Sequence, residues 1–316
     1  MRSPTPLTAW SYADFPIVLR PHVQYRMQKF PLLRAGVIER GLLPRENVHV
    51  APEIDPAVLE LAHTPGYIAA IRDGTLTTAA VREMGFDWSP GLYVRGCRIV
   101  GSALAAGGAA LRCGAGIVLG GGAHHSFADR GRGFCIFNDI VITARALRAT
   151  GRVRRVAVLD CDVHQGDGTA ALTAEDPGIY TFSVHAEKNY PFRKEVSDLD
   201  IALPDNAGDR EYLDAVDAGL AAILDEPEID LVIYIAGADP FVEDRLGRLA
   251  VSAEGLRSRD DLVFSTCRTH GIPVLILLGG GYCEPIDQTV ALGLQTVAVA
   301  VSIFGSSAQH VGLDAL

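Results

Sequence analysis

Four ionisable side chains follow a short apolar run near the middle of the chain, and their spacing suits the binding of a metal ion. The run is Val156–Leu159, and the polar residues after it are Asp160, Asp162, His164 and Asp167. Asp162 and His164 are two positions apart, so in an extended chain their side chains point the same way. A carboxylate and an imidazole from one segment supply two of the three protein ligands of a catalytic zinc site. Asp167 could equally cap the helix that follows, so this segment alone leaves both interpretations open.

Other side chains capable of chemistry follow other apolar runs, in most cases after glycines. Glycine turns after parallel strands are common, so each residue taken alone also has a purely structural explanation. That explanation is stronger for Tyr282 than for His124 and His125. The carboxyl ends of parallel strands meet at one edge of a sheet, so we expect these residues to converge. They are His124 and His125 after 117–119, Asp239 after 230–236, and Tyr282 after 273–278.

The converging residues divide into ligands and acid–base groups. Asp239 is the natural third ligand beside Asp162 and His164, and two carboxylates with one imidazole suit zinc without excluding iron or cobalt. Asp160 and Asp167 remain to orient the two histidines, which fixes the tautomer and raises the basicity of a general base. Tyr282 would donate a hydrogen bond to an oxyanion. The reaction class that uses these parts is metal-assisted hydrolysis of an amide.

The remaining pattern predicts an α/β protein with a central parallel β-sheet flanked by helices, organised as a single domain over residues 1–316. The first 25 residues are Pro-rich and irregular, and His22 and His63 are expected to be ordinary surface or helix-end histidines. The expected strands are 117–119, 156–159, 179–184, 230–236 and 273–278. The expected helices are 25–40 (kinked near Pro31), 56–63, 96–112, 136–149, 169–174, 210–224, 253–270 and 285–304, with a loop over 86–94.

Composition limits the environment and partners. The chain has 316 residues, a formal net charge of −10 and a pI of about 5.3, so no overall basic field would attract nucleic acid. Its six cysteines include no C-x-x-C pair, which fits a reducing compartment. Residues 1–15 show no apolar signal core, and apolar stretches such as 272–278 are too short to span a bilayer. We therefore expect a soluble cytoplasmic protein.

Three other enzyme chemistries find little support. The glycines at 120–122 are not followed by a phosphate-binding Gly-Lys-Ser/Thr sequence. The chain has no Gly-x-Ser-x-Gly elbow of a serine hydrolase. Its cysteines lack the cationic surroundings that activate a thiol.

Five segments carry a recognisable pattern: Gly121–Ser126, Arg130–Cys135, Asp160–Gly168, Ala236–Pro240 and Leu278–Tyr282. Together they resemble the zinc-dependent histone deacetylase family, which includes acetylpolyamine amidohydrolases and acetoin-utilisation proteins and has the arginase-like fold. The resemblance runs from about residue 16 to 304 and is closest to class IV and bacterial deacetylase-like proteins, particularly over 243–249. Arginases share the fold, but they need a second metal and have an Asp-x-His-x-Asp order, whereas this chain has Asp-x-Asp-x-His.

This resemblance implies a role for each residue. The zinc ligands would be Asp162, His164 and Asp239. Zinc and Tyr282 would polarise the scissile carbonyl, and a potassium ion would bind near the zinc through Asp160, Asp162, His164 and the Ser183–Val184 segment. His125 is the favoured base and His124 the acid or electrostatic partner, held by Asp167 and Asp160 respectively. Gly133 and Phe134 would line the acyl tunnel.

Some positions depart from the family pattern or stay open. Ala123 stands where many members carry a bulkier residue, which leaves room for longer acyl chains. Tyr190 and Phe192 both qualify as the second tunnel aromatic: the proline that follows favours Tyr190, and counting from His185 favours Phe192. The acidic residue that binds the substrate backbone in many members has no secure match, and Asp87 is only a candidate.

The resemblance implies hydrolysis of an N6-acyl-lysine peptide or protein, by a deacetylase or a longer-chain deacylase. The alternative substrate is an acetylpolyamine or another small acylated amine. Net charge does not decide between these cationic substrates, although we find no long insertion of the kind polyamine enzymes use to narrow the site. A binding protein that kept the fold without activity is disfavoured because all ligands, both histidines and Tyr282 are present.

Overall fold

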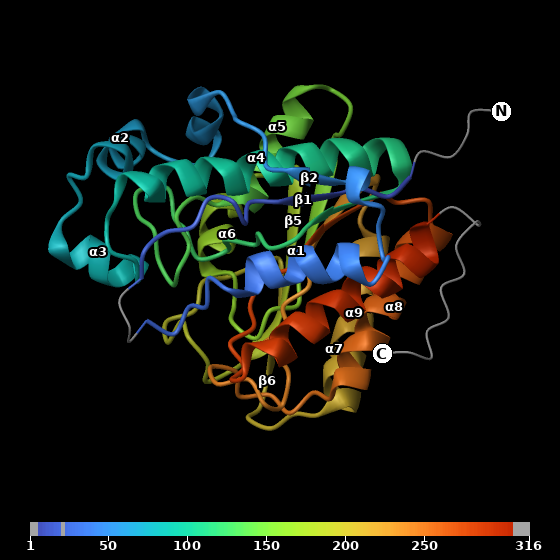
Figure 1. Cartoon of the computed structure of the whole chain (residues 1–316). Helices are drawn as coiled ribbons and strands as arrows, with labels where there is room; N and C mark the ends of the chain where they lie inside the picture. Colours follow the sequence, from blue (N-terminus) through green and yellow to red (C-terminus); the bar gives the residue numbers. More distant parts are fainter. Residues whose placement is uncertain (1–5, 20–22, 306–316) are drawn as a thin grey trace.

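The structure is a computed structural model that describes residues 6–19 and 23–305, and within them the strands form one eight-stranded sheet (Figure 1). The strand order is β2-β1-β3-β8-β7-β4-β5-β6, and every neighbouring pair is parallel. The predicted α/β class with a central parallel sheet is therefore confirmed.

The strands and helices alternate through most of the chain. The strands are β1 (Ala9–Ser11), β2 (Val48–Val50), β3 (Ala115–Val118), β4 (Arg155–Asp160), β5 (Ile179–Ala186), β6 (Leu199–Leu203), β7 (Ile229–Ile235) and β8 (Val274–Leu277). The α-helices are α1 (Lys29–Glu39), α2 (Pro65–Asp73), α3 (Thr78–Met84), α4 (Pro90–Cys113), α5 (Asp139–Ala149), α6 (Asp167–Thr173), α7 (Asp209–Asp225), α8 (Ala253–Thr269) and α9 (Ile286–Phe304). Two short 3₁₀ helices cover Arg45–Asn47 and Pro56–Leu61.

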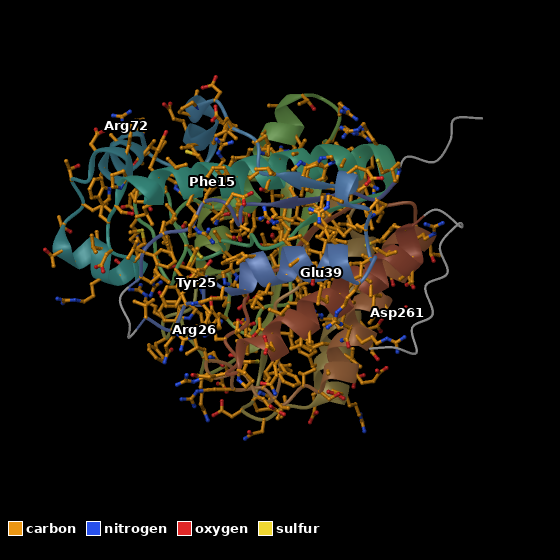
Figure 2. All side chains as sticks on the ribbon, viewed as in Figure 1. Phe15, Tyr25, Arg26, Glu39, Arg72 and Asp261 are labelled. Carbon is orange, nitrogen blue, oxygen red and sulfur yellow. The ribbon has the colours of Figure 1, made fainter. Side chains whose placement is uncertain are left out.

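Helices cover both faces of the sheet because alternate strand residues point to opposite sides. In β4, Val156 and Val158 pack with residues of α4 and α5, whereas Ala157 and Leu159 pack with α1, α7, α8 and α9. Figure 1 shows α4 and α5 on one side of the strands and the red and orange helices α9 and α8 on the other. Exposed charged side chains such as Arg72 and Asp261 lie at the periphery (Figure 2). The central strands are thus buried on both faces, as their continuous apolar sequence predicts.

Every expected strand is confirmed to within a few residues, as are the expected helices from 136 onwards. The sequence did not predict the edge strands β2 and β6, the short strand β1 beside β2, or the helices α2 and α3. The expected helix over 56–63 is a 3₁₀ helix, and the expected loop over 86–94 ends early because α4 begins at Pro90. Pro31 lies in the first turn of α1, where proline is tolerated without a kink.

His63 follows the end of the 3₁₀ helix Pro56–Leu61, in agreement with the helix-end expectation, but it is not a surface residue, because its ring is buried between two backbone segments. Its Nδ1 lies 2.9 Å from the carbonyl oxygen of Phe127, and its Nε2 accepts a hydrogen bond from the Asn138 N–H at 2.8 Å. Burial lowers its pKa to about 4, so it bridges these segments as a neutral ring. His22 lies outside the described residues.

Helix α9 is long and apolar enough to cross a membrane by length and composition alone, unlike the other helices in the described part of the chain. The expectation that the apolar stretches are too short, drawn from segments such as 272–278, is wrong for this helix. Leu292, Leu294 and Val297 are nevertheless buried in the core shared with α1 and α8. Such packing is the usual position of an apolar helix inside a domain.

A buried ion pair joins α8 to β7 and α9. Asp260 accepts hydrogen bonds from the Arg259 guanidinium at 3.0 and 2.8 Å, and from the hydroxyls of Tyr234 and Thr296, each at 2.6 Å. Arg259 also donates to the carbonyl of Gly237 at 2.6 Å, at the start of the loop that carries Asp239. Both charges are almost fully buried, so each depends on the other.

Replacing Asp260 with asparagine should lower the free energy of unfolding by about 3–5 kcal/mol, because it leaves the buried charge of Arg259 uncompensated. Urea unfolding followed by circular dichroism would measure the change. The matched control is Asp217→Asn, which removes an exposed carboxylate from α7 and should change stability little. Equal unfolding midpoints for the two variants would contradict the structural role of this pair.

Candidate functional site

The polar residues singled out in the sequence meet because the strands that precede them are neighbours. β3, β8, β7 and β4 lie side by side in that order and all run in the same direction. The loops that follow them carry the histidine pair, Tyr282, Asp239 and the Asp162–His164 segment, respectively. The carboxyl ends of parallel strands commonly form such sites, and here four of them contribute.

Asp162, His164 and Asp239 form a buried group whose ligand atoms lie within 4.8 Å of one another. Nδ1 of His164 lies 2.9 Å from Oδ1 of Asp162 and 3.2 Å from Oδ2 of Asp239. Oδ2 of Asp239 is buried and has no hydrogen-bond partner among the described residues. A buried carboxylate oxygen without a donor is costly unless a cation occupies the site. The three side chains therefore fit a metal ion.

Backbone groups hold these ligands in place. The N–H of Asp162 donates to Asp160 at 3.1 Å, and the N–H of Val163 donates to Oδ1 of Asp239 at 3.0 Å. Gly280 has a φ of +26° and passes so close that a Cβ there would clash with the carboxylate of Asp239 and lie 2.6 Å from Oδ2 of Asp162. Glycine at this position lets the backbone after β8 close over the ligands.

The two adjacent histidines each have their own carboxylate, as the sequence predicts. Nδ1 of His124 lies 2.7 Å from Asp160, and Nδ1 of His125 lies 2.6 Å from Asp167. The carboxylates receive the Nδ1–H groups, which leaves each Nε2 for other interactions, and Nε2 of His124 lies 3.8 Å from Asp162. Asp167 is the first residue of α6, but its side chain is used for His125 and for Arg132 as well. The simple helix-cap interpretation of Asp167 therefore does not account for its contacts.

The two rings differ in their proton affinity. Burial alone would lower the pKa of His124, but Asp160 and Asp162 outweigh it and raise the pKa to about 9. Burial and the neighbouring histidines His124 and His164 lower the pKa of His125 well below its usual value. The rings are 4.1 Å apart, so a charge on one disfavours a charge on the other. This arrangement favours a proton on His124 over a proton on His125.

The ring of Tyr282 lies edge-on to that of His164, with the ring centroids 6.5 Å apart. Its backbone N–H donates to Asp244 at 2.6 Å, which ties the loop after β8 to the loop after β7. Burial, together with Asp239 and Asp162, raises the pKa of its hydroxyl well above the usual value. Tyr282 is therefore a neutral hydrogen-bond donor.

A cavity of about 570 Å³ leads from the surface to these groups. Its lining includes Gly133, Phe134, Tyr190 and Phe192, so the structure brings all four predicted tunnel residues to it. Tyr190 is partly buried, with its ring 5.1 Å from that of His125, whereas Phe192 is 88% exposed. Tyr190 thus forms the inner wall and Phe192 the outer rim.

The other predicted residues take different positions. His124, His125, Asp162, His164 and Tyr282 also line this cavity. Asp160, Asp167 and Asp239 are buried and are not part of the cavity lining. Asp87 is not among the residues that line the cavity.

Sequence reasoning missed several polar residues that position the site. Asp139 accepts hydrogen bonds from the N–H groups of Gly122 and Ala123 at 3.0 and 2.7 Å, which fixes the loop before the histidine pair. Asn189 donates to the carbonyl of Leu246 at 2.6 Å and joins the loops after β5 and β7. Nothing local in the sequence marks either residue, because their partners are distant along the chain.

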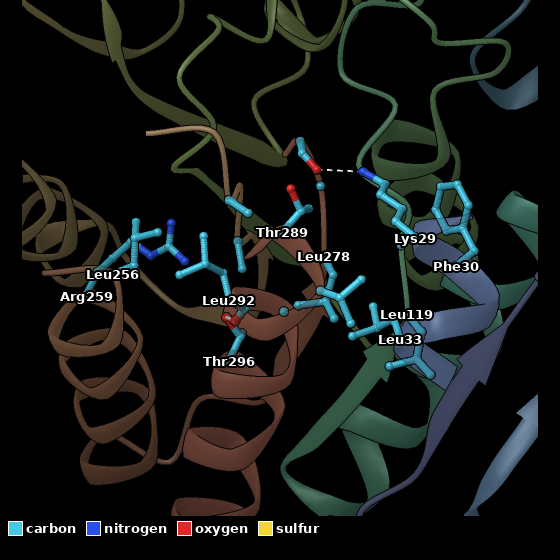
Figure 3. A pocket seen from close by; sticks show the side chains of 17 residues that line it. Lys29, Phe30, Leu33, Leu119, Leu256, Arg259, Leu278, Thr289, Leu292 and Thr296 are labelled. Carbon is cyan, nitrogen blue, oxygen red and sulfur yellow. Dashed lines mark hydrogen bonds between the residues drawn. The ribbon is translucent and has the colours of Figure 1, made fainter. Parts of the chain in front are cut away.

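Lys29 is a further missed residue, and it lines both the large cavity and a small one of about 20 Å³, whose lining is drawn in Figure 3. Its Nζ donates to the carbonyl of Gly280 at 2.6 Å, the contact drawn as a dashed line in Figure 3. Burial lowers its pKa to about 8 despite the nearby carboxylates of Asp239 and Asp162. The small cavity has room for about one water molecule.

Comparisons with known proteins agree with this geometry. A family model for the histone deacetylase domain matches residues 21–297. An uncharacterized protein of Picosynechococcus is 41% identical over 284 residues, 87% of this chain and 95% of that protein. Histone deacetylase 2 of Arabidopsis thaliana is 28% identical over 272 residues, 83% of this chain and 70% of that protein.

The fold also matches a solved structure. The crystal structure of an HDAC homolog from Aquifex aeolicus superposes with a TM-score of 0.80 at 20% identity, covering 94% of this chain and 84% of that one. The region matched by the family model contains the Asp162–His164–Asp239 group, the histidine pair and Tyr282. The chain therefore belongs to the histone deacetylase family.

Proposed function

We propose that this protein is a zinc-dependent hydrolase that cleaves the amide of N6-acyl-lysine in peptides or proteins. The observation that carries the proposal is the buried Asp162–His164–Asp239 group at the end of an open cavity, with an unpartnered oxygen on Asp239. The chemistry of its donors, two carboxylates and one imidazole, suits zinc. When bound, the ion would supply Lewis-acid activation of the carbonyl and of water.

The residues around the ligands have distinct tasks in this proposal. His125, neutral and oriented by Asp167, accepts the proton from the attacking water as general base. His124, held by Asp160 and protonated, stabilises negative charge and can supply a proton to the leaving amine. Tyr282 donates its hydroxyl to the oxygen that becomes negative during the attack.

The size and lining of the cavity support a substrate whose acyl group is longer than acetyl. Ala123 contributes only a methyl group to its wall, beside Gly121 and Gly122. Tyr12 and Tyr25 belong to the same lining. A volume of about 570 Å³ is within the range of sites that enclose whole ligands, roughly 300–1,000 Å³.

A series of otherwise identical lysine peptides, acylated with chains from acetyl to myristoyl, tests the proposal. We expect the zinc-loaded protein to hydrolyse at least one member, a chelator to stop the reaction and added zinc to restore it. Acetylputrescine in the same assay tests the alternative of a small acylated amine. Hydrolysis of acetylputrescine alone would overturn the lysine assignment, and no hydrolysis of any compound would favour a binding protein without activity.

Two further features belong to this proposal. A potassium ion would bind beside the zinc site through Asp160, Asp162, His164 and the Ser183–Val184 segment, and Asp160 and Ser183 are paired in register between β4 and β5. We also propose a cytoplasmic location, which is supported by the free state of all six cysteines. Neither the potassium ion nor the location is needed for the chemistry above.

A further inference from the structure

The mouth of the active-site cavity is rich in cations although the chain as a whole is acidic. Apart from the metal-ligand group, the exposed charged side chains that line it are Arg82, Lys188, Arg245 and Arg248 against one carboxylate, Glu83. The formal net charge of the whole chain is −10. Arg245 is paired with Glu284 and Arg248 lies 3.1 Å from Asp205, so the positive charge at the mouth that is not paired comes from Arg82 and Lys188.

Two of these cations have no ion-pair partner in the part of the chain that the structure describes. Arg82 and Lys188 are exposed, and no carboxylate of the described residues forms an ion pair with either. Arg82 comes from α3 and Lys188 from the loop after β5, so two separate elements present them to the same opening. Both side chains are available to a ligand.

The carboxylates near the mouth are already shared among cations. Glu83 lies 3.4 Å from Arg132 and 3.8 Å from Arg130. Glu284 pairs with Arg245 and lies 3.7 Å from Arg26 as well. These acidic groups therefore do not cancel the positive charge of Arg82 and Lys188.

An apolar surface adjoins the charges. Phe192 is 88% exposed, and its ring packs edge-on against Tyr190 with the centroids 6.3 Å apart. An exposed phenylalanine at the rim of a cavity offers a surface for the apolar part of a bound chain. The mouth thus combines an aromatic edge with positive charges that come from different elements around it.

We propose that the mouth selects acyl-lysine residues whose neighbours in the substrate chain are aspartate or glutamate. This inference rests on the proposed function and specifies which residues flank the acyl-lysine in the preferred substrate. An extended peptide whose acyl-lysine enters the cavity places its flanking residues against the rim, where acidic side chains meet Arg82 and Lys188. Protonated polyamines and lysine-rich peptides meet like charge at the same place, which disfavours them.

Three peptides test this inference, built around one central acyl-lysine with flanking glutamates, glutamines or lysines. The acyl group is the one hydrolysed fastest in the chain-length series. At about 20 mM salt we expect kcat/KM to be roughly fivefold higher for the glutamate peptide than for the glutamine peptide, mainly through KM. The difference should shrink at about 300 mM salt, because exposed charges are screened.

A double variant, Arg82→Gln with Lys188→Gln, should bring the ratio of kcat/KM between the glutamate and glutamine peptides close to one. The matched control, Arg40→Gln with Arg152→Gln, makes the same change in net charge at exposed positions away from the cavity and should keep the ratio. A preference that survives in the mouth variant, or equal kcat/KM for all three peptides in the unaltered protein, would overturn the proposed selection. No hydrolysis of any acyl-lysine peptide would overturn the proposed function and this inference with it.

Discussion

Asp239→Asn is expected to abolish both zinc binding and amide hydrolysis while leaving the protein folded. Oδ2 of Asp239 is buried, lies 3.2 Å from Nδ1 of His164 and has no hydrogen-bond donor among the described residues, so the partner that this oxygen lacks is a cation. An asparagine supplies a neutral amide in place of this charge. The loss of activity should exceed the roughly 10–100-fold that removal of an outer hydrogen-bond partner of a metal ligand costs.

The metal-free protein should not be destabilised by this change. Burial, and then the charge of Asp162, raise the pKa of Asp239 although His164 and the N–H of Val163 lower it, so the ionised carboxylate is disfavoured in this buried position. Asparagine removes that charge and still accepts the hydrogen bond from the N–H of Val163. Unfolding of the metal-free proteins in urea should therefore give Asp239→Asn a midpoint no lower than that of the unaltered protein.

Elemental analysis of zinc and the rate of peptide hydrolysis measure the main effect, with Asp217→Asn as the control for loss of a carboxylate. Stoichiometric zinc in Asp239→Asn, together with an undiminished rate, would show that Asp239 is not a ligand. Low zinc with an undiminished rate would show that the reaction does not depend on this site.

Tyr282→Phe should lower kcat by about 10²–10³-fold with zinc content and KM little changed, the magnitude found when a single oxyanion donor is removed. The hydroxyl of Tyr282 makes no hydrogen bond with another residue in the described ranges, so its removal leaves no internal partner unsatisfied. The ring, which packs beside Phe134 and under Lys29, is retained. The effect should therefore fall on the reaction and not on the fold.

Steady-state kinetics on one acyl-lysine peptide, with zinc measured in the same samples, would test this prediction. Tyr93→Phe removes a hydroxyl from α4, outside the cavity lining, and serves as the control. An unchanged kcat in Tyr282→Phe would assign the oxyanion to other donors. A loss of zinc in this variant would mean that Tyr282 acts by holding the ligands.

The sequence determined the chemistry of the site because the relevant residues lie directly after apolar strands. The strands before Asp162, Asp239, Tyr282 and His124 are continuous apolar runs, which is the pattern of strands buried on both faces. Once such strands are parallel, their following residues must meet at one edge. The Asp–His–Asp group and the two His–Asp pairs were therefore predictable in composition.

The sequence did not predict elements whose stability depends on contacts elsewhere. β1 and β2 have three residues each, too few to show an alternating pattern, and they are strands because β1 pairs with β3 on one side and β2 on the other. Residues such as Asp139 and Asp244 look like ordinary polar residues. Their roles arise from hydrogen bonds to the backbone before His125 and at Tyr282, which the chain order hides.

Tertiary structure also decided how the site meets a substrate. The order β3-β8-β7-β4 makes four functional loops neighbours, although β3 and β8 are far apart along the chain. The same packing brings Arg82 and Lys188 to one opening in a protein whose net charge is negative. The residue types that follow the strands determine which chemistry is possible, and these types can be read directly from the local sequence. The distances between those residues, the depth of the cavity and the charge of its mouth depend on side chains brought together only by folding.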